Sequence, residues 1–235
     1  MPIPIPILHL TRGPAAVELG KARALHNEFV GSGPQPGIEI ARSLGDISHA
    51  ILVSAEDTAP QELLFVDLWV DGNGMEAFFG NPFAQETGDL LFSSREESEW
   101  HRAPGGFDYQ VPTPDGLEAV YFAVFRARTA AVADAVPGFV DAVSAQLPSA
   151  RRQGQLSHAL YVRERQAISG HPASNSRRAE GRPVDHTAPT AEILALDAWP
   201  TLDGIYRHYR QFTQVEGIDA GELTVWRHAD GFIEW

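Results

Sequence analysis

The sequence predicts an α+β protein made of two similar halves, each with the order strand, helix, strand, strand, helix, strand. Residues 58–79, TAPQELLFVDLWVDGNGMEAFF, return in altered form at 187–209 as TAPTAEILALDAWPTLDGIYRHY. A second pair, GDISHAILV at 45–53 and GQLSHALYV at 154–162, lengthens the repeat. A repeat of this length indicates duplication of a domain, because solenoids have shorter periods.

The elements of the first half, residues 1–110, follow from alternation, helical spacing and turn residues. Four segments have the residue pattern of strands, and glycine-rich turns separate them from one longer and one shorter helix. We expect strands at 3–10, 47–55, 62–70 and 95–103, with helices at 15–29 and 75–79.

The second half, residues 118–235, repeats this order after a Pro/Gly-rich linker at 111–117. We expect strands at 118–128, 156–165, 192–199 and from 222 to 228, with helices at 130–147 and 202–212. Pro137-Gly138 predicts a kink or a division of the longer helix. The loop 166–189 has no long counterpart in the first half; its arginines suggest a lid or a contact arm, and a solvated tip is the plainer interpretation.

Composition excludes several classes of function. The 235 residues carry a formal net charge of −13, which disfavours nucleic acid and anionic membranes as partners. The absence of cysteine excludes thiolate nucleophiles and Cys-ligated metals. No signal peptide or long apolar run is visible, so we expect a cytoplasmic protein.

Each half should form a four-stranded antiparallel sheet with two helices on one face. The other face is also apolar and needs a partner, for which the sister sheet is the simplest choice. Two sheets packed in this way predict a barrel with the helices outside, and a monomer or a homodimer as the oligomeric state.

The chain resembles the dimeric α+β-barrel superfamily in a tandem ferredoxin-like form, and within it antibiotic-biosynthesis-monooxygenase-like domains. The resemblance rests on Trp69 and Trp199, each before an aromatic helix, and on REESEW at 95–100. It implies two ferredoxin-like repeats forming a pseudo-dimeric barrel. The superfamily includes cofactor-independent oxygenases, haem-degrading enzymes and members without known activity, so the fold does not settle the function.

The sharpest chemical feature is a predicted His–Asp pair in each half. In a hairpin centred on Thr58, opposed residue numbers add up to about 116, which pairs His49 with Asp67. The same reasoning pairs His158 with Asp197. Because side chains alternate along a strand, we expect Ile47 to share the face of His49.

A carboxylate beside an imidazole fixes its tautomer and raises its basicity, so each pair is a candidate general base. The equally physical alternative is that each pair satisfies itself in the core and fixes the hairpin. Aromatic residues on the same faces are candidate walls for an aromatic substrate: Phe65, Trp69, Trp199 and Tyr209.

The leading interpretation is therefore a monooxygenase-like enzyme acting on a small aromatic or polyketide-like molecule. It implies no organic cofactor and no metal. The alternative is a non-catalytic protein of the same fold that binds an apolar metabolite or serves assembly. Haem-degrading relatives pair a strand tryptophan with a histidine on the next helix, as Trp199 and His208 could; Phe78 and Phe79 stand there in the first half. We expect His208 to be solvated or capping.

Overall fold

The computed structural model describes residues 6–32, 36–106, 108–110, 120–129, 132–164, 191–210 and 221–235. The expected linker and the loop 166–189 lie outside these residues. The chain forms two compact units, residues 1–101 with 226–235 (unit 1) and residues 102–225 (unit 2). These units differ from the expected halves at their ends, because the segment after the last strand of each half belongs to the other unit.

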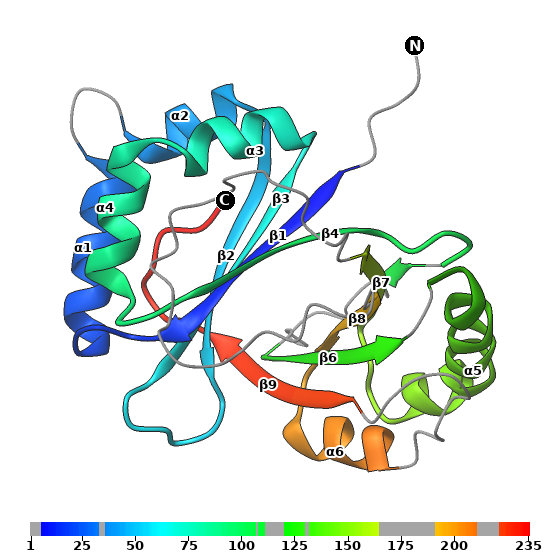
Figure 1. Ribbon diagram of the computed structural model, residues 1–235. Helices are drawn as coiled ribbons and strands as arrows, with labels where there is room; N and C mark the ends of the chain where they lie inside the picture. Colours follow the sequence, from blue (N-terminus) through cyan, green and yellow to red (C-terminus); the bar gives the residue numbers. More distant parts are fainter. Residues whose placement is uncertain are drawn as a thin grey trace, which may run out of the picture. The chain divides into compact units, whose positions relative to one another are not determined.

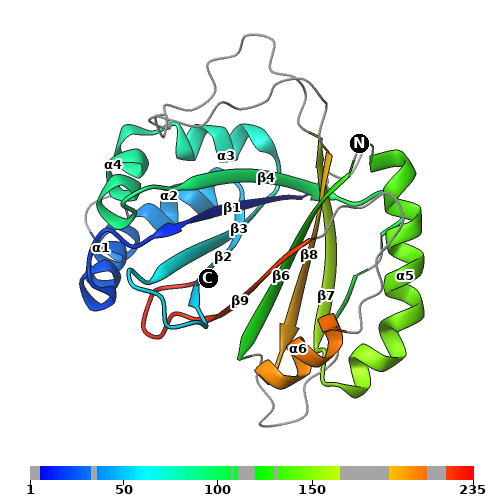
Figure 2. The same cartoon turned by 60° about the horizontal axis from the view of Figure 1, so that its bottom comes forward.

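Unit 1 is a sheet with helices on one face (Figures 1 and 2). Its strands are antiparallel in the order β4-β1-β3-β2, and the end of β9 pairs with the edge of β2. Its elements are β1 (Ile7–Pro14), α1 (Leu19–Gly31), α2 (Gly37–Ser43), β2 (Asp46–Ser54), β3 (Glu62–Trp69), α3 (Gly72–Phe79), α4 (Pro82–Leu91) and β4 (Glu96–Arg102).

Unit 2 has the corresponding strand order, β9-β6-β8-β7, extended at its edge by β5. Its elements are β5 (Tyr109–Gln110), β6 (Tyr121–Thr129), α5 (Val132–Arg152), β7 (Ser157–Glu164), β8 (Ala191–Trp199), α6 (Leu202–Arg210) and the start of β9 (Glu222–His228). The predicted α+β class is confirmed.

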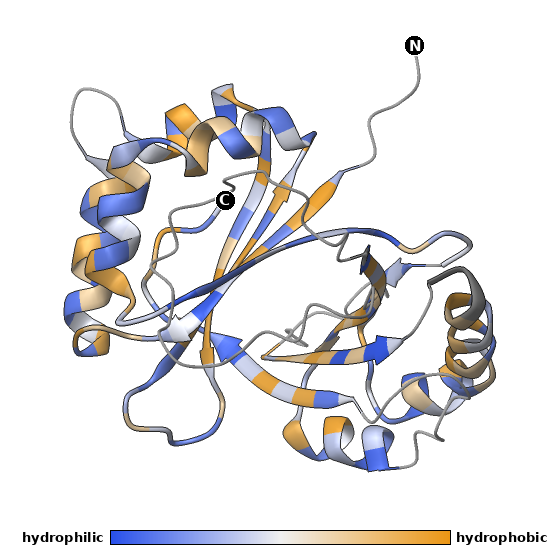
Figure 3. Cartoon of the chain, in the orientation of Figure 1, coloured by the Kyte–Doolittle hydropathy of each residue, from blue (hydrophilic) through white to orange (hydrophobic). Residues whose placement is uncertain are grey.

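Apolar and polar residues alternate along the helices of unit 1 (Figure 3). One core cluster joins α1, β2 and β3 through residues such as Ala22, Ile51 and Leu63. The core of unit 2 centres on Phe139, Leu160 and Ile193. Within the described residues no helix combines the length and apolar character needed to cross a bilayer.

Two helices, α2 and α4, were not among the expected elements. Strand β1 begins at Ile7 in the described residues, and residues 3–5 of the expected strand lie outside them. Helix α4 forms in a polar stretch because Asn81 caps it with its side chain and Pro82 starts it. Helix α5 is not divided at Pro137, since packing of neighbours such as Phe139 overrides local propensity.

Candidate functional site

The hairpin of unit 1 has the predicted register. His49 lies opposite Asp67 across β2 and β3, and its Nδ1 hydrogen bonds to Asp67 Oδ1. In unit 2, His158 lies opposite Asp197, and the corresponding distance is 2.6 Å. All four side chains are buried. The structure therefore brings each predicted pair together.

A second histidine, which the sequence did not predict as part of the site, extends the pair of unit 1. His26 on α1 is 2% exposed, and its Nε2 lies 3.1 Å from Nε2 of His49. The rings are nearly coplanar, 9° apart, and meet head-on. The nitrogens therefore share one proton, because two lone pairs would repel at this distance.

Asn27 fixes the direction of this hydrogen-bonded chain. Its Nδ2 donates to the carbonyl of Gly231 at 2.8 Å, and its Oδ1 accepts from the amide of Ile233 at 2.9 Å. The same Oδ1 lies 3.1 Å from His26 Nδ1, so Nδ1 is the donor. Counting one proton in each link gives an imidazolium shared by the two histidines, balanced by the Asp67 carboxylate.

The electrostatic environment favours this charge distribution. Burial alone would lower the pKa of His49, but the charge of Asp67 and the hydrogen bond to it outweigh burial and raise that pKa. Burial would raise the pKa of Asp67, and the charge and hydrogen bond of His49 lower it instead. Burial, followed by the charge of His49, lowers the pKa of His26 to about 4. The proton therefore belongs mainly to His49.

A β-bulge at the start of β2 adds a further acid to the site. The register with β3 shifts between Asp46 and Ser48. Ile47 is consequently 47% exposed, while Asp46 is 7% exposed. The expectation that Ile47 shares the face of His49 was wrong, because a bulge changes which side chains point inward. Asp46 and His49 line the same cavity as a result.

The segment after β9 covers the His49 ring. Backbone hydrogen bonds join Trp235 and His49 in both directions, at 2.8 and 3.1 Å. The Trp235 ring stacks on the imidazole with centroids 4.5 Å apart. Glu234 accepts from the amide of Ile51 at 2.7 Å. This segment therefore holds His49 in place from the side opposite β3.

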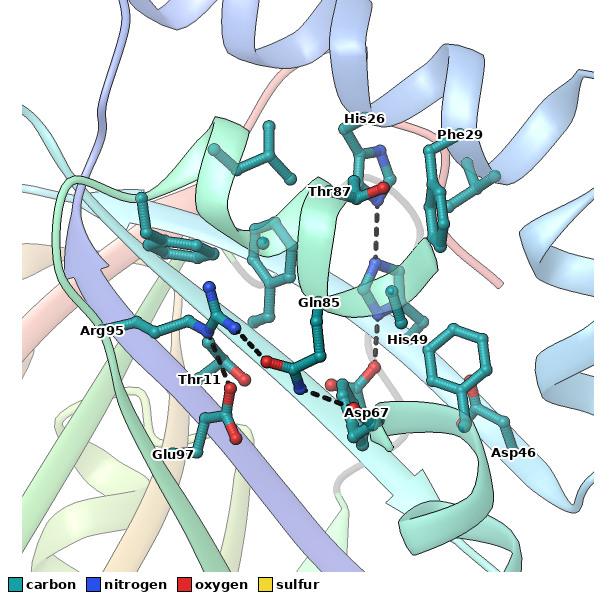
Figure 4. A pocket seen from close by; sticks show the side chains of 18 of the residues that line it. Thr11, His26, Phe29, Asp46, His49, Asp67, Gln85, Thr87, Arg95 and Glu97 are labelled. Carbon is teal, nitrogen blue, oxygen red and sulfur yellow. Dashed lines mark hydrogen bonds and ion pairs between the residues drawn. The ribbon is translucent and has the colours of Figure 1, made fainter. Parts of the chain in front are cut away.

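These groups border a cavity in unit 1 (Figure 4). The cavity volume is about 60 Å³. Its walls are largely aromatic: Phe29, Phe65, Phe78, Phe79 and Phe92. Apolar and aromatic walls of this kind are typical of sites that bind small organic molecules.

A second polar group borders the cavity at Arg95. Its guanidinium donates to Glu97 at 2.7 Å, to Asp89 at 2.7 Å and to Gln85 at 2.6 Å. Two carboxylates balance this cation, so it adds little net charge for a ligand to meet.

The corresponding site of unit 2 is filled. Asp197 accepts a 2.6 Å hydrogen bond from the Tyr209 hydroxyl. Tyr209 holds the position of Phe79 in the repeat, and the space beside it admits a water centre over only about 10 Å³. That is room for about one water molecule. The two units therefore share a His–Asp frame, and of the two cavities beside these pairs in the described residues the one in unit 1 is larger.

Of the four aromatic residues predicted to form walls of a substrate site, two line a cavity and two are buried behind other side chains. Phe65 lines the cavity of unit 1, and Tyr209 lines the small cavity of unit 2. Trp69 is fully buried behind Phe78, so it supports the wall instead of forming it. Trp199 is also fully buried, beside α6.

His208 is buried, 6% exposed, instead of solvated, because its ring packs on Trp199 with centroids 5.4 Å apart. Burial lowers its pKa. The small space beside it does not fit a haem. In the described part of the chain, no group of three or more acidic or histidine side chains is arranged to hold a metal ion.

Comparison with known proteins identifies the fold. No family model and no curated protein matches the sequence. Solved structures match nearly the whole chain: a candidate monooxygenase of Fusobacterium nucleatum has 10% identity and a TM-score of 0.52, over 98% of this chain and 97% of that one. An anthrone oxidase-like protein has 12% identity and a TM-score of 0.56, over 95% and 91%.

A chlorite dismutase variant of Candidatus Nitrospira defluvii is similar to the same degree, with 10% identity and a TM-score of 0.54 over 98% of this chain and 94% of that one. At such low identity the shared property is the fold. Function must be argued from the residues of the site.

Proposed function

We propose that unit 1 carries the active site of a monooxygenase-like enzyme that oxidises a small aromatic or polyketide-like molecule. The observation that carries the proposal is an aromatic cavity bordered by the buried chain of His26, His49 and Asp67. The matching solved structures include a candidate monooxygenase and an anthrone oxidase-like protein, which supports the same reaction class. The repeated strand order supports assignment to the tandem ferredoxin-like form of the α+β-barrel superfamily.

The proposed substrate is an aromatic ketone with an acidic CH₂ group, as in anthrone. Loss of a proton gives an enolate, which passes electrons to O₂. In the balanced reaction the CH₂ group becomes a carbonyl, one oxygen atom enters the product and the other leaves as water. Phe65 and Phe79 supply flat walls for such a ring system.

His49 has an electrostatic role in this proposal. Both of its ring nitrogens are engaged, with Asp67 and with His26, so it acts on the enolate through its positive charge. A fixed charge in a site shielded from water stabilises a developing anion without reorganisation. Asp67 is a positioning residue that keeps the proton on His49. In unit 2, His158 and Asp197 would serve structure, because Tyr209 occupies the space.

The test is oxidation of anthrone by the purified protein, followed by oxygen uptake and by the absorbance of anthraquinone. We expect turnover above the rate without protein, and a fall in kcat of about 100-fold in His49→Ala, the size found when one group that stabilises an oxyanion is removed. His158→Ala should lower thermal stability more than turnover.

Oxygen uptake no faster than in buffer, with anthrone and with a panel of phenols, would contradict the proposal. If His49→Ala bound anthraquinone less tightly in such a protein, the alternative of a non-catalytic carrier of apolar metabolites would be favoured.

A further inference from the structure

Asp46 is a buried acid in the unit 1 cavity to which no role has been given so far. It is 7% exposed and lines the cavity beside His49 and Asp67. Its Oδ1 has no hydrogen-bond partner among the described residues. A buried carboxylate oxygen without a partner costs folding free energy, so its presence in the cavity calls for a reason.

The other proton-carrying groups at this end of the cavity are already engaged. His49 uses Nδ1 for Asp67 and Nε2 for His26, and His26 uses Nδ1 for Asn27. Neither ring can receive a proton from a ligand without breaking a buried hydrogen bond. Asp46 can do so through Oδ1.

The residue that corresponds to Asp46 in unit 2 has a different side chain and a hydrogen-bond partner. Gln155 takes the place of Asp46 in the repeat, after Gly154 as Asp46 follows Gly45, and both glycines have positive φ, 105° and 101°. Gln155 accepts a hydrogen bond from the Tyr109 hydroxyl. Unit 2 therefore has a hydrogen-bonded amide where unit 1 has an acid with one oxygen, Oδ1, left without a partner.

The surroundings of Asp46 suit proton transfer. Burial and the charge of Asp67 raise the pKa of Asp46 to about 7, against the opposing effects of the His49 charge, the Trp235 indole and the Ser48 backbone amide. A general base works best when its pKa lies near the working pH. The Trp235 indole, which affects this carboxyl, lines the same cavity.

We propose that Asp46 is the general base of the unit 1 site and takes the acidic proton of the aromatic substrate on Oδ1. The C–H bond breaks, its electron pair stays on the substrate as an enolate, and the His49 imidazolium stabilises that charge. The substrate class rests on the proposed function, while the proton transfer itself needs no oxygen.

Proton transfer is measured without oxidation by following deuterium exchange into the CH₂ group of anthrone in D₂O, without oxygen, by NMR. The wild-type protein should accelerate exchange over buffer, with a rate that rises with pH through a midpoint near 7. Asp46→Asn should exchange about 100- to 10,000-fold more slowly, the usual contribution of a positioned base, and its rate should lose that midpoint.

Asp57→Asn, which removes an exposed carboxylate from the β2–β3 hairpin, is the matched control and should exchange as the wild type does. Asp46→Asn should fold, because an amide is accommodated at the same position of unit 2; thermal unfolding checks this.

Exchange by folded Asp46→Asn within about threefold of the wild type, or no acceleration by the wild type, would overturn the assignment. A loss of exchange with an unchanged pH midpoint would also overturn it, since that is the result of a merely structural role. A wild-type protein that accelerates exchange through Asp46 but never consumes oxygen would support Asp46 and refute the oxidation reaction.

Discussion

Replacing Asp67 with asparagine measures how much the buried ion pair with His49 contributes to folding. The two side chains are only 5% and 8% exposed, so solvent screens their attraction weakly. Asparagine keeps the shape and can still accept a hydrogen bond, but it removes the negative charge that balances the imidazolium. Removing one partner of a buried pair costs about 3–5 kcal/mol, and we expect a loss near the lower end because His49 can then lose its proton.

The loss should depend on pH in a direction fixed by the two pKa shifts. The pKa of His49 is raised above 6.5 in the folded protein, so its contribution is complete below 6.5 and disappears as pH rises through the raised value. The pKa of Asp67 is lowered below 3.8, so its contribution is complete above 3.8 and disappears in stronger acid. The pair therefore stabilises most between those two values.

Urea unfolding of the wild type and Asp67→Asn at about pH 5.5 and about pH 9.5 tests this, with the slope of free energy against urea checked for equality. We expect the difference in unfolding free energy to be about 3 kcal/mol at the lower pH and clearly smaller at the higher pH. A difference below about 1 kcal/mol at pH 5.5, typical of an exposed pair, or one independent of pH, would refute the charge assignment. Asp57→Asn should show no such difference.

Three further substitutions test other parts of the structure. Phe79→Tyr should place a hydroxyl near Asp67, as Tyr209 does at Asp197, and lower anthrone oxidation while keeping the fold; unchanged kcat and KM would contradict the cavity assignment. Tyr209→Phe should lower unfolding free energy by about 1.5–3 kcal/mol, the value of a hydrogen bond to a charged group, with little effect on turnover. Asn27→Ala should lower the melting temperature, since Asn27 joins α1 to Gly231 and Ile233. It should also lower the pKa of His26 further in an NMR titration, because the Asn27 hydrogen bond raises that pKa; a titration identical to wild type would argue against the fixed proton direction.

The repeat and the hairpin registers could be predicted because both depend on patterns within the sequence. Alternation and the short turn at Thr58 were enough to place His49 opposite Asp67. The alignment of the two repeats also contained a signal for Asp46, because Gln155 stands at the corresponding position of the second copy. That signal was missed because the bulge, which turns Asp46 inward, has no pattern of its own.

The rest of the site depends on long-range packing. His26 has ordinary helical spacing in the sequence. It is 23 residues away from His49 along the chain, and only the fold brings the two rings together. The Trp235 cover over His49 joins segments still further apart. The burial of His208 was missed for the same reason, because it depends on the packing of its ring against Trp199, which is a tertiary contact.

The most direct test of the account is a crystal structure of the protein with anthraquinone, the expected product. The account predicts the ring system in unit 1, between Phe65 and Phe79, with an oxygen atom near Asp46 and Trp235. Anthraquinone bound against His158 in unit 2, or bound away from both histidines, would contradict the claim that unit 1 holds the active site.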